Sequence, residues 1–454
     1  MIILHKATIV TGEKEAVGSI IIEEGRISDI LYADADDYDF RVGKYIEDAD
    51  AEVWQLEGKH VMAGGIDAHV HFREPGLTHK ADMATESRAA VSGGVTTVFD
   101  MPNTNPPTIT AGALKEKMQL AEGRSVAKTG FHIGATNSNA DSICNLIVNG
   151  DEGCGVKAED IPGVKVFMGS STGNMLVDQK NSLERLFQIS EKPILVHCED
   201  EQTIKENLAA AQEKYGDDIP FAEHEHIRSR RACIKSSIKA LEMAMKHGTK
   251  LVLCHISTKE EIEMVRAAKT NNPDITAETS CNYLWFSNED YERAGSLVKC
   301  NPSIKTAEDR QALRNALAEG LIDTIGSDHA PHLLSEKEGI YTKAPSGLPS
   351  IQQSLPVLVT IAREEGIPLT RITSAFSEKA SEIYGLKRGK IRRGYDADLV
   401  IFDIDKEFIV RSEDQQSKCG WTPYEGVTLK GYIEAVLIDG KAVIRDGKLT
   451  VCQE

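Results

Sequence analysis

Through the middle of the chain, from about residue 61 to residue 385, short apolar runs alternate with charged, helix-forming stretches. The stretches SLERLFQISE, EEIEMVRAAKT and DRQALRNALAEG keep apolar residues at helical spacing. The eight apolar runs are HVMAGGIDAHVHF, GVTTVFDMP, AKTGFHIGAT, IPGVKVFMGS, KPILVHCED, TKLVLCHIS, DITAETSCNYL and LIDTIGSDHAPH. This alternation predicts an α/β fold, a (β/α)₈ TIM barrel over residues 61–385. A doubly wound open sheet is the alternative.

The two ends of the chain follow a different pattern. Residues 1–60 and 386–454 consist of short strand-like segments separated by glycine or charged turns, with no helical crossover pattern. We therefore expect both termini to build one small β-sandwich-like domain beside the barrel.

The net charge of the chain limits which molecules it can bind. The chain has 454 residues and a net charge of −18, from 70 acidic and 52 basic side chains. Such a balance argues against broad nucleic-acid binding and against attraction to anionic membranes, so an anionic substrate must be held by local cations. The nine cysteines form no CxxC pair, the N-terminus lacks the features of a signal peptide, and no apolar run approaches ~18 residues. We expect a cytoplasmic enzyme with free thiols.

Several of the predicted strands end in groups that bind divalent metals. The carboxyl ends of barrel strands meet at one mouth, and side chains two apart on a strand point the same way. Imidazole and carboxylate ligands suit zinc. The candidate ligands are His69, His71, Lys165, His197, His255 and Asp328. Asp328 could also take a proton from water and return it to a leaving group.

Lys165 has two interpretations that the spacing leaves open. An unmodified ammonium would repel metal ions, and its head could simply leave the barrel mouth for solvent. An amine that has reacted with carbon dioxide would instead offer two anionic oxygens that bridge two metals. Asp151, in a turn-like segment, is the competing bridge. A second His-x-His pair, His224 and His226, lies in a charged helical or loop segment, and we expect solvated polar residues there.

These motifs resemble the cyclic amidohydrolases of the amidohydrolase superfamily, most closely the dihydroorotases. The resemblance covers nearly the whole chain and is carried by GGIDAHVHFREPG, GGVTTVFDMPNTNP, VHCED, CHIST, SDHAPH and GKIRRGYDADLVIFD. It implies that the six candidate ligands hold two zinc ions bridged by a carboxylated Lys165. It also implies that Asp328 is catalytic, moving the proton as N-carbamoyl-aspartate and dihydroorotate interconvert in pyrimidine biosynthesis.

The resemblance also assigns residues to the substrate. Arg73, Asn103 and His332 would bind its carboxylate, and a bidentate arginine suits a planar anion. Asn301 and the backbone of Gly347 and Leu348 would meet the ring amides. The chain departs from many relatives in lacking an Asp-Asp-Gly-type bridging segment and in carrying Lys305 within NPSIK. Lys305 lies in the loop that would orient the substrate, so this departure bears on how the loop does so.

Three functions therefore stand as candidates. The first is dihydroorotase, supported by Arg73, Asn103 and His332. The second is a hydantoinase, dihydropyrimidinase or allantoinase with the same metal ligands. The third is a metal-free scaffold that binds partners, although such proteins typically lose ligands that this chain keeps. Because family members are often dimers or tetramers, we expect a homodimer or homotetramer acting on a small molecule.

Overall fold

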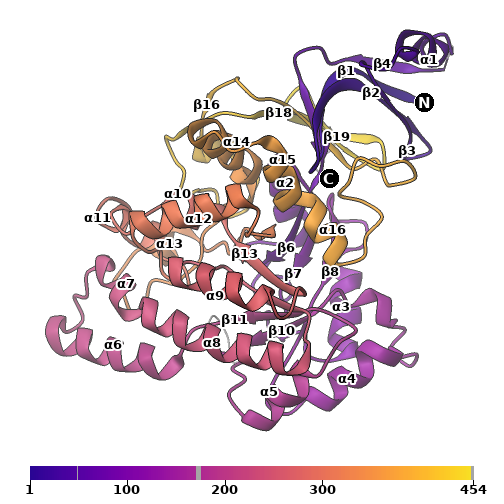
Figure 1. The fold of residues 1–454 in the computed structure, drawn as a ribbon. Helices are drawn as coiled ribbons and strands as arrows, with labels where there is room; N and C mark the ends of the chain where they lie inside the picture. Colours follow the sequence, from indigo (N-terminus) through magenta and orange to yellow (C-terminus); the bar gives the residue numbers. More distant parts are fainter. Residues whose placement is uncertain (49, 170–174, 451–454) are drawn as a thin grey trace.

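The computed structural model describes residues 1–48, 50–169 and 175–450, and the two ends of the chain meet in one sheet. It has nine strands in the order β20-β19-β18-β15-β5-β1-β2-β3, with β4 paired to β1 (Figure 1). The segments join where β5 runs antiparallel to β15. The strands are β1 (Ile2–Val10), β2 (Glu15–Glu23), β3 (Arg26–Tyr32), β4 (Glu52–Gln55), β5 (His60–Ala63), β15 (Leu399–Asp403), β18 (Tyr432–Ile438), β19 (Lys441–Arg445) and β20 (Lys448–Leu449).

This terminal sheet has its own apolar core. Leu4 and Ile9 of β1 pack with Ile20 of β2, and Leu399 of β15 and Leu437 of β18 complete the cluster from the other end of the chain. Helix α1 (Tyr38–Ile46) lies against β3 through Tyr38 and Val42. Strands β16 (Phe408–Ile409) and β17 (Thr428–Leu429) form a separate two-stranded ribbon.

The central region contains parallel strands. They are β6 (Gly65–Val70), β7 (Val95–Asp100), β8 (Lys128–Phe131), β9 (Ile133–Gly134), β10 (Val164–Phe167), β11 (Ile194–His197), β12 (Leu251–Leu253), β13 (Ile275–Thr279) and β14 (Thr324–Ile325). Strands β6 to β8 pair in sequence order, and so do β9 to β14. Only His132 separates β8 from β9. Each of the eight apolar runs contains at least one of these strands, and no pairing among them reverses the strand order as a doubly wound sheet requires.

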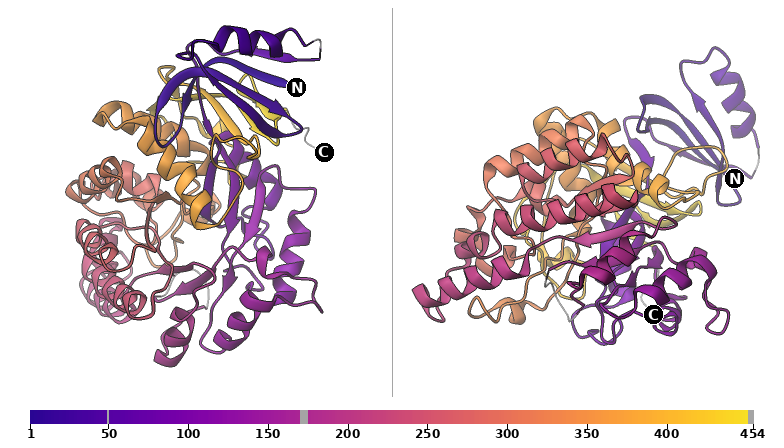
Figure 2. Two further views of the ribbon diagram at one scale, coloured as in Figure 1. Left: turned by 45° about the vertical axis from the view of Figure 1, so that its right-hand side comes forward. Right: turned by 60° about the horizontal axis from the view of Figure 1, so that its bottom comes forward.

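Helices follow the central strands and lie outside them (Figure 2). They include α2 (Met83–Ser92), α3 (Ala111–Ala121), α4 (Ala140–Asn149), α5 (Lys180–Phe187), α6 (Glu201–Tyr215), α8 (Arg230–His247), α9 (Lys259–Lys269), α12 (Ala307–Glu319) and α14 (Ser354–Glu365). Local sequence sets several starts: Thr258 and Glu261 form a capping box at α9, as Thr306 and Asp309 do at α12. The predicted helices in SLERLFQISE, EEIEMVRAAKT and DRQALRNALAEG are confirmed as α5, α9 and α12.

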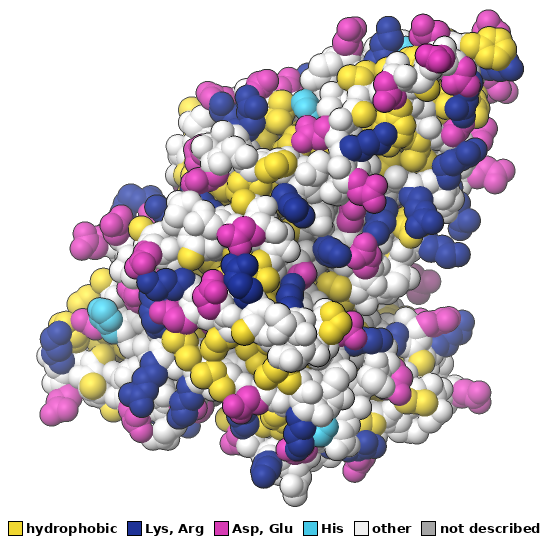
Figure 3. Space-filling view, viewed as in Figure 1, with side chains coloured by type: hydrophobic (Ala, Val, Ile, Leu, Met, Phe, Trp, Pro, Cys, Tyr) yellow, Lys and Arg dark blue, Asp and Glu magenta, His cyan; other side chains and the backbone are white. Residues whose placement is uncertain are grey.

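The surface mixes charges of both signs. On the face shown in Figure 3, lysine and arginine side chains are interspersed with aspartate and glutamate, and no extended basic patch gathers there. Within the described ranges, no helix has the length and apolar character that a membrane crossing needs.

Candidate metal centre and substrate site

Two histidines and an aspartate meet beyond the ends of β6 and β14. His69 lies in β6, His71 directly follows that strand, and Asp328 follows β14. The Oδ1 atom of Asp328 is 3.0 Å from Nε2 of His71 and 3.5 Å from Nε2 of His69. One ligand atom from each of the three lies within 4.8 Å of the other two. Burial opposes the charge of Asp328, but His69, His71 and His255 lower its pKa below the ordinary value, so the carboxylate is anionic.

The outer nitrogens of the first two rings are held by other side chains. Nδ1 of His69 is 2.7 Å from Oε1 of Glu278, which lies in β13. Nδ1 of His71 is 2.8 Å from Oδ1 of Asn103. Because each of these oxygens accepts a proton from Nδ1, each Nε2 keeps its lone pair and faces Asp328. This is the arrangement in which a histidine binds a metal.

A second pair of histidines lies beside the first. Nδ1 of His197 is 2.8 Å from Nε2 of His255, and the rings of His255 and His69 have centroids 5.3 Å apart. Nε2 of His197 is 3.0 Å from Glu199, whose carboxylate also binds Arg228. Burial lowers the pKa of both His197 and His255, which leaves the rings neutral as metal ligands must be.

Lys165 reaches the same place from strand β10. It is fully buried, and its Nζ lies 3.4 Å from Sγ of Cys254. After burial, its charge is the next largest influence lowering the pKa of His69, so the two groups are close. Lys165 forms no ion pair with any residue that the structure describes. A buried ammonium without an anion is costly, whereas a carboxylated amine would bring an anion to this cluster.

The donor set suits divalent metal ions. It offers four imidazoles and one carboxylate, and the buried Nδ1 of His255 has no hydrogen-bond partner among the described residues. Buried nitrogen and oxygen donors with free lone pairs are what zinc takes as ligands. The residues present therefore fit a metal centre.

Backbone strain gathers at this site. Arg73, His255 and Asp328 have φ angles of 66°, 41° and 49°, in the left-handed region. Each such conformation costs on the order of 1 kcal/mol for a residue other than glycine, and such residues cluster at functional sites. The strained backbone aims a site side chain at each of the three positions.

The candidate carboxylate-binding residues lie next to the metal ligands. Arg73 is 3% exposed; its Nε donates to the carbonyl of Pro331, and its Nη2 is 3.1 Å from Nε2 of His332. Burial lowers the pKa of Arg73 to about 10, which still leaves it charged near neutral pH. Asn103 touches His71, so it joins the arginine side of the site to the metal side.

The remaining predicted substrate contacts lie in two loops. Asn301 has a buried Oδ1 without a partner among the described residues. The N–H of Gly347 donates to the carbonyl of Lys299, and the carbonyl of Leu348 accepts from Ala330. Lys305 is buried, and its Nζ donates to the carbonyl and the hydroxyl of Ser303. Lys305 therefore stabilises the loop from within.

Two other sequence candidates belong elsewhere. Asp151 accepts a hydrogen bond from the N–H of Cys154 in a tight turn, and it is not part of the cluster of His69, His71 and Asp328. The prediction for His224 is wrong: the side chain is buried, not solvated, with Nδ1 2.7 Å from the hydroxyl of Tyr341 and Nε2 2.8 Å from the carbonyl of Cys300. His226 is exposed, as expected.

Sequence reasoning missed three residues that support this site. Glu278 holds His69, Glu199 holds His197, and Lys80 contacts His332. A signal existed for the first two: Glu278 ends the apolar run DITAE, and Glu199 follows His197 by two positions in VHCED. For Lys80 the local sequence gave none.

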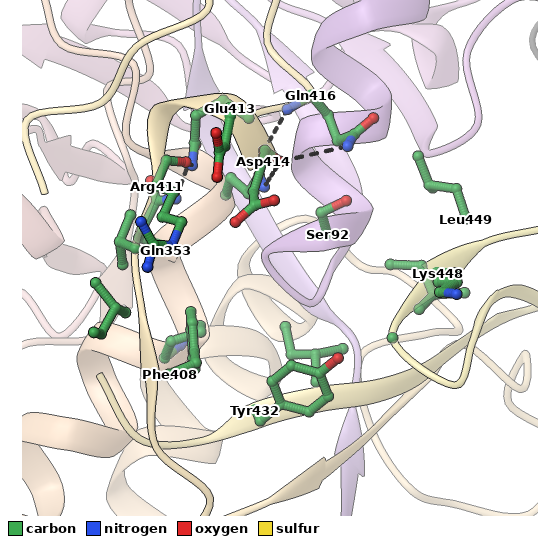
Figure 4. Close-up of a pocket in the computed structure, with 18 residues that line it drawn as sticks. Ser92, Gln353, Phe408, Arg411, Glu413, Asp414, Gln416, Tyr432, Lys448 and Leu449 are labelled. Carbon is green, nitrogen blue, oxygen red and sulfur yellow. Dashed lines mark hydrogen bonds between the residues drawn. The ribbon is translucent and has the colours of Figure 1, made fainter. Parts of the chain in front are cut away.

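A separate pocket lies away from these histidines. It has a volume of about 560 Å³ and is bounded by Ser92 of α2, Gln353, and the C-terminal residues Phe408, Arg411 and Tyr432 (Figure 4). Its lining includes no histidine or cysteine.

Known proteins resemble the chain over nearly its whole length. The model of the amidohydrolase family matches residues 60–443. A dihydroorotase of Methanosarcina mazei is 36% identical over 420 residues, which cover 90% of this chain and 86% of the relative. An allantoinase of Desulfitobacterium hafniense is 31% identical and covers 88% of both chains. The solved L-hydantoinase (dihydropyrimidinase) of Arthrobacter aurescens superposes with a TM-score of 0.89 at 26% identity, covering 99% of this chain and 97% of that one.

Proposed function

The chain belongs to the amidohydrolase family, and we propose that it is a zinc-dependent dihydroorotase. It would interconvert N-carbamoyl-L-aspartate and L-dihydroorotate in pyrimidine biosynthesis in the cytoplasm. The observation that carries the proposal is Arg73, a buried guanidinium beside the metal ligands that faces His332 and forms no ion pair with any described residue. A substrate carboxylate would supply the missing anion. The 36% identical dihydroorotase supports the same substrate.

The architecture supports placing the site in a closed barrel. Isolated parallel bridges join Val70 at the end of β6 to His329, and His329 to Leu348. They join the end of β6 to the segment that follows β14, and on this support we propose a (β/α)₈ barrel over residues 61–385 with Asp328 at the seam. Residues 1–60 and 386–454 would form the β-sandwich-like domain, which shares the nine-stranded sheet. Homodimer or homotetramer formation is a proposal from the family.

The metal ligands would be shared between two zinc ions. His69, His71, Lys165, His197, His255 and Asp328 would hold them, with a carboxylated Lys165 as the bridge. Bound zinc would polarise the ring carbonyl and make water a stronger nucleophile at neutral pH. Glu278 and Glu199 keep the rings of His69 and His197 oriented for this task.

The protein's own groups would handle the proton and the substrate. Asp328 is an anionic carboxylate at the centre of the cluster, so its Oδ1 would take the proton of the attacking water during ring opening. It would return that proton to the leaving ring nitrogen, and the reverse order would close the ring. Arg73, Asn103 and His332 would bind the substrate carboxylate. Asn301 and the backbone at Gly347 and Leu348 would orient the ring amides.

The second candidate is a cyclic amidase for a neutral ring. It is favoured by the 31% identical allantoinase and by the likeness to the solved L-hydantoinase. A neutral ring, however, leaves the buried charge of Arg73 without an anionic partner. The metal-free scaffold is disfavoured because all six ligand positions are filled by groups able to bind metal or be converted to do so.

A direct comparison of substrates tests the proposal. We would assay ring opening of dihydroorotate, dihydrouracil, hydantoin and allantoin, and ring closure of N-carbamoyl-aspartate, with and without added zinc. Dihydroorotate should have the highest kcat/KM, and the Arg73→Met variant should lose about 100-fold or more on it. Faster turnover of a neutral ring would overturn the assignment, and well under one zinc per chain in metal-replete protein would favour the scaffold.

The Lys165 bridge has its own test. Protein loaded with ¹³C-labelled bicarbonate and zinc should show a carbamate carbon signal that is absent from the Lys165→Ala variant. The variant should also lose bound zinc. If it retained both metals and the full rate, the bridge assignment would be wrong.

A further inference from the structure

His332 lies between two cations. Its ring is 2% exposed, with Nε2 3.1 Å from Nη2 of Arg73 and Nδ1 3.0 Å from Nζ of Lys80. Nε2 is also 3.1 Å from the carbonyl of Ser346. Burial, Arg73 and Lys80 together lower the pKa of His332 far below its usual range, so the ring is neutral. A neutral imidazole has one N–H, and these contacts decide which nitrogen carries it.

Lys80 is the group that fixes the tautomer. Its Nζ also pairs with Oε1 of Glu336 at 2.9 Å, which holds the side chain in place as a donor. An ammonium has no lone pair to accept a proton, so Nδ1 of His332 must be the acceptor. The proton therefore lies on Nε2, where the carbonyl of Ser346 accepts it. His332 thus presents an N–H, not a lone pair, on the side where Arg73 lies.

In this tautomer Nε2 of His332 and Nη2 of Arg73 are both donors, and a bound anion would supply an acceptor that neither offers the other. Both Nη2 of Arg73 and Nε2 of His332 then carry hydrogens, so neither accepts from the other across their 3.1 Å separation. A carboxylate placed beside them would accept from Nη2 of Arg73 and would share the single Nε2–H of His332 with the carbonyl of Ser346. Arg73, His332 and Lys80 lie in a row. Among the described residues, Glu336 is the only acid within ion-pair distance of these three side chains, and it contacts Lys80 and Nδ1 of His332, at the end away from Arg73.

We infer that Lys80 is a positioning residue that sets the specificity of this site for an acidic ring. It would do so by holding His332 as a neutral Nε2–H donor and by placing a positive charge behind that donor. The inference rests on the proposed function, because it concerns the same carboxylate subsite. Lys80 itself does not touch the reacting atoms.

The test replaces the charge while keeping the length of the side chain. Lys80→Met should raise the KM for dihydroorotate and the Kd for orotate by about tenfold, the value of one lost charge-assisted contact. The kcat should change by less than about threefold, and turnover of dihydrouracil should not change, because a neutral ring does not use the subsite. Lys80→Arg should restore most of the affinity.

Two controls separate this effect from general loss. Lys157→Met removes an equal charge from a side chain that is 75% exposed, and its orotate affinity should match the wild type. The ¹⁵N signals of the His332 ring should show a protonated Nε2 in the wild type and a mixture of tautomers in Lys80→Met. Equal losses on dihydroorotate and dihydrouracil, or unchanged orotate binding and ¹⁵N signals, would overturn the inference. Because orotate binding and the ¹⁵N signals need no turnover, they test Lys80 even if the wild type failed to hydrolyse dihydroorotate.

Discussion

The chain contains two His-x-His pairs, and they do different things. His69 and His71 leave a strand with their ring centroids 5.6 Å apart, and both direct Nε2 toward Asp328. His224 and His226 lie in the short helix α7 (His224–Ile227), where one ring is buried and the other is exposed. The same spacing on a strand places two side chains on one face and on a helix separates them by about 200°. The backbone, and not the motif, brings the rings of His69 and His71 to one carboxylate.

The largest effect is expected when one ring of the first pair is removed. His71→Asn shortens the side chain and takes Nε2 away from Asp328, so we expect bound zinc to fall and kcat/KM to drop by about 10³-fold or more. Metal analysis of the purified variant and steady-state assays measure both. A variant with full zinc content and a rate within tenfold of the wild type would show that His71 is not a ligand.

Substitutions in the second pair, His224 and His226, should change the stability of the fold and not the zinc content. His224→Phe leaves the hydroxyl of Tyr341 and the carbonyl of Cys300 without their partner, so the free energy of unfolding should fall by about 2–4 kcal/mol. Zinc content should stay at the wild-type value. The matched control is His226→Phe, an exposed position where the change should lie within about 0.5 kcal/mol. Urea unfolding of the two variants measures both changes in the free energy of unfolding. Loss of zinc from His224→Phe would contradict a purely structural role for His224.

The contrast also explains how much the sequence could predict. Apolar runs and turn signals are local, and they are enough to locate the central strands and the histidines at or near their ends. Glu278 and Lys80 act on histidines that are 209 and 252 residues away in the chain, so the local sequence does not show which histidine each of them contacts. His224 was misjudged for the same reason: its charged neighbours indicate solvent, but Tyr341, 117 residues later, packs over it. Burial set by distant contacts overrides local polarity.

His224 holds one end of a loop whose other end is held by buried lysines. Nζ of Lys299 donates to the carbonyls of Tyr341 and Ala344. Nζ of Lys337 donates to the carbonyls of Pro345 and Gly347 at 2.8 and 3.1 Å. The loop that carries the proposed ring contacts at Gly347 is therefore fixed by side chains that are themselves out of water.

The burial of Lys337 predicts that the stability of the fold depends on pH, and this is the smallest effect that we expect. Burial lowers the pKa of Lys337 to about 7 from 10.5, so between those pH values the unfolded chain binds a proton that the folded protein has lost. The free energy of unfolding should therefore rise with pH across that window, and Lys337→Met should lose on the order of 1 kcal/mol of that rise between pH 7 and 9. Urea unfolding at both pH values measures it, with Lys157→Met as the exposed control. Identical slopes for the wild type and Lys337→Met would mean that the carbonyls around Nζ hold the lysine charged, so that they, and not burial, control its proton.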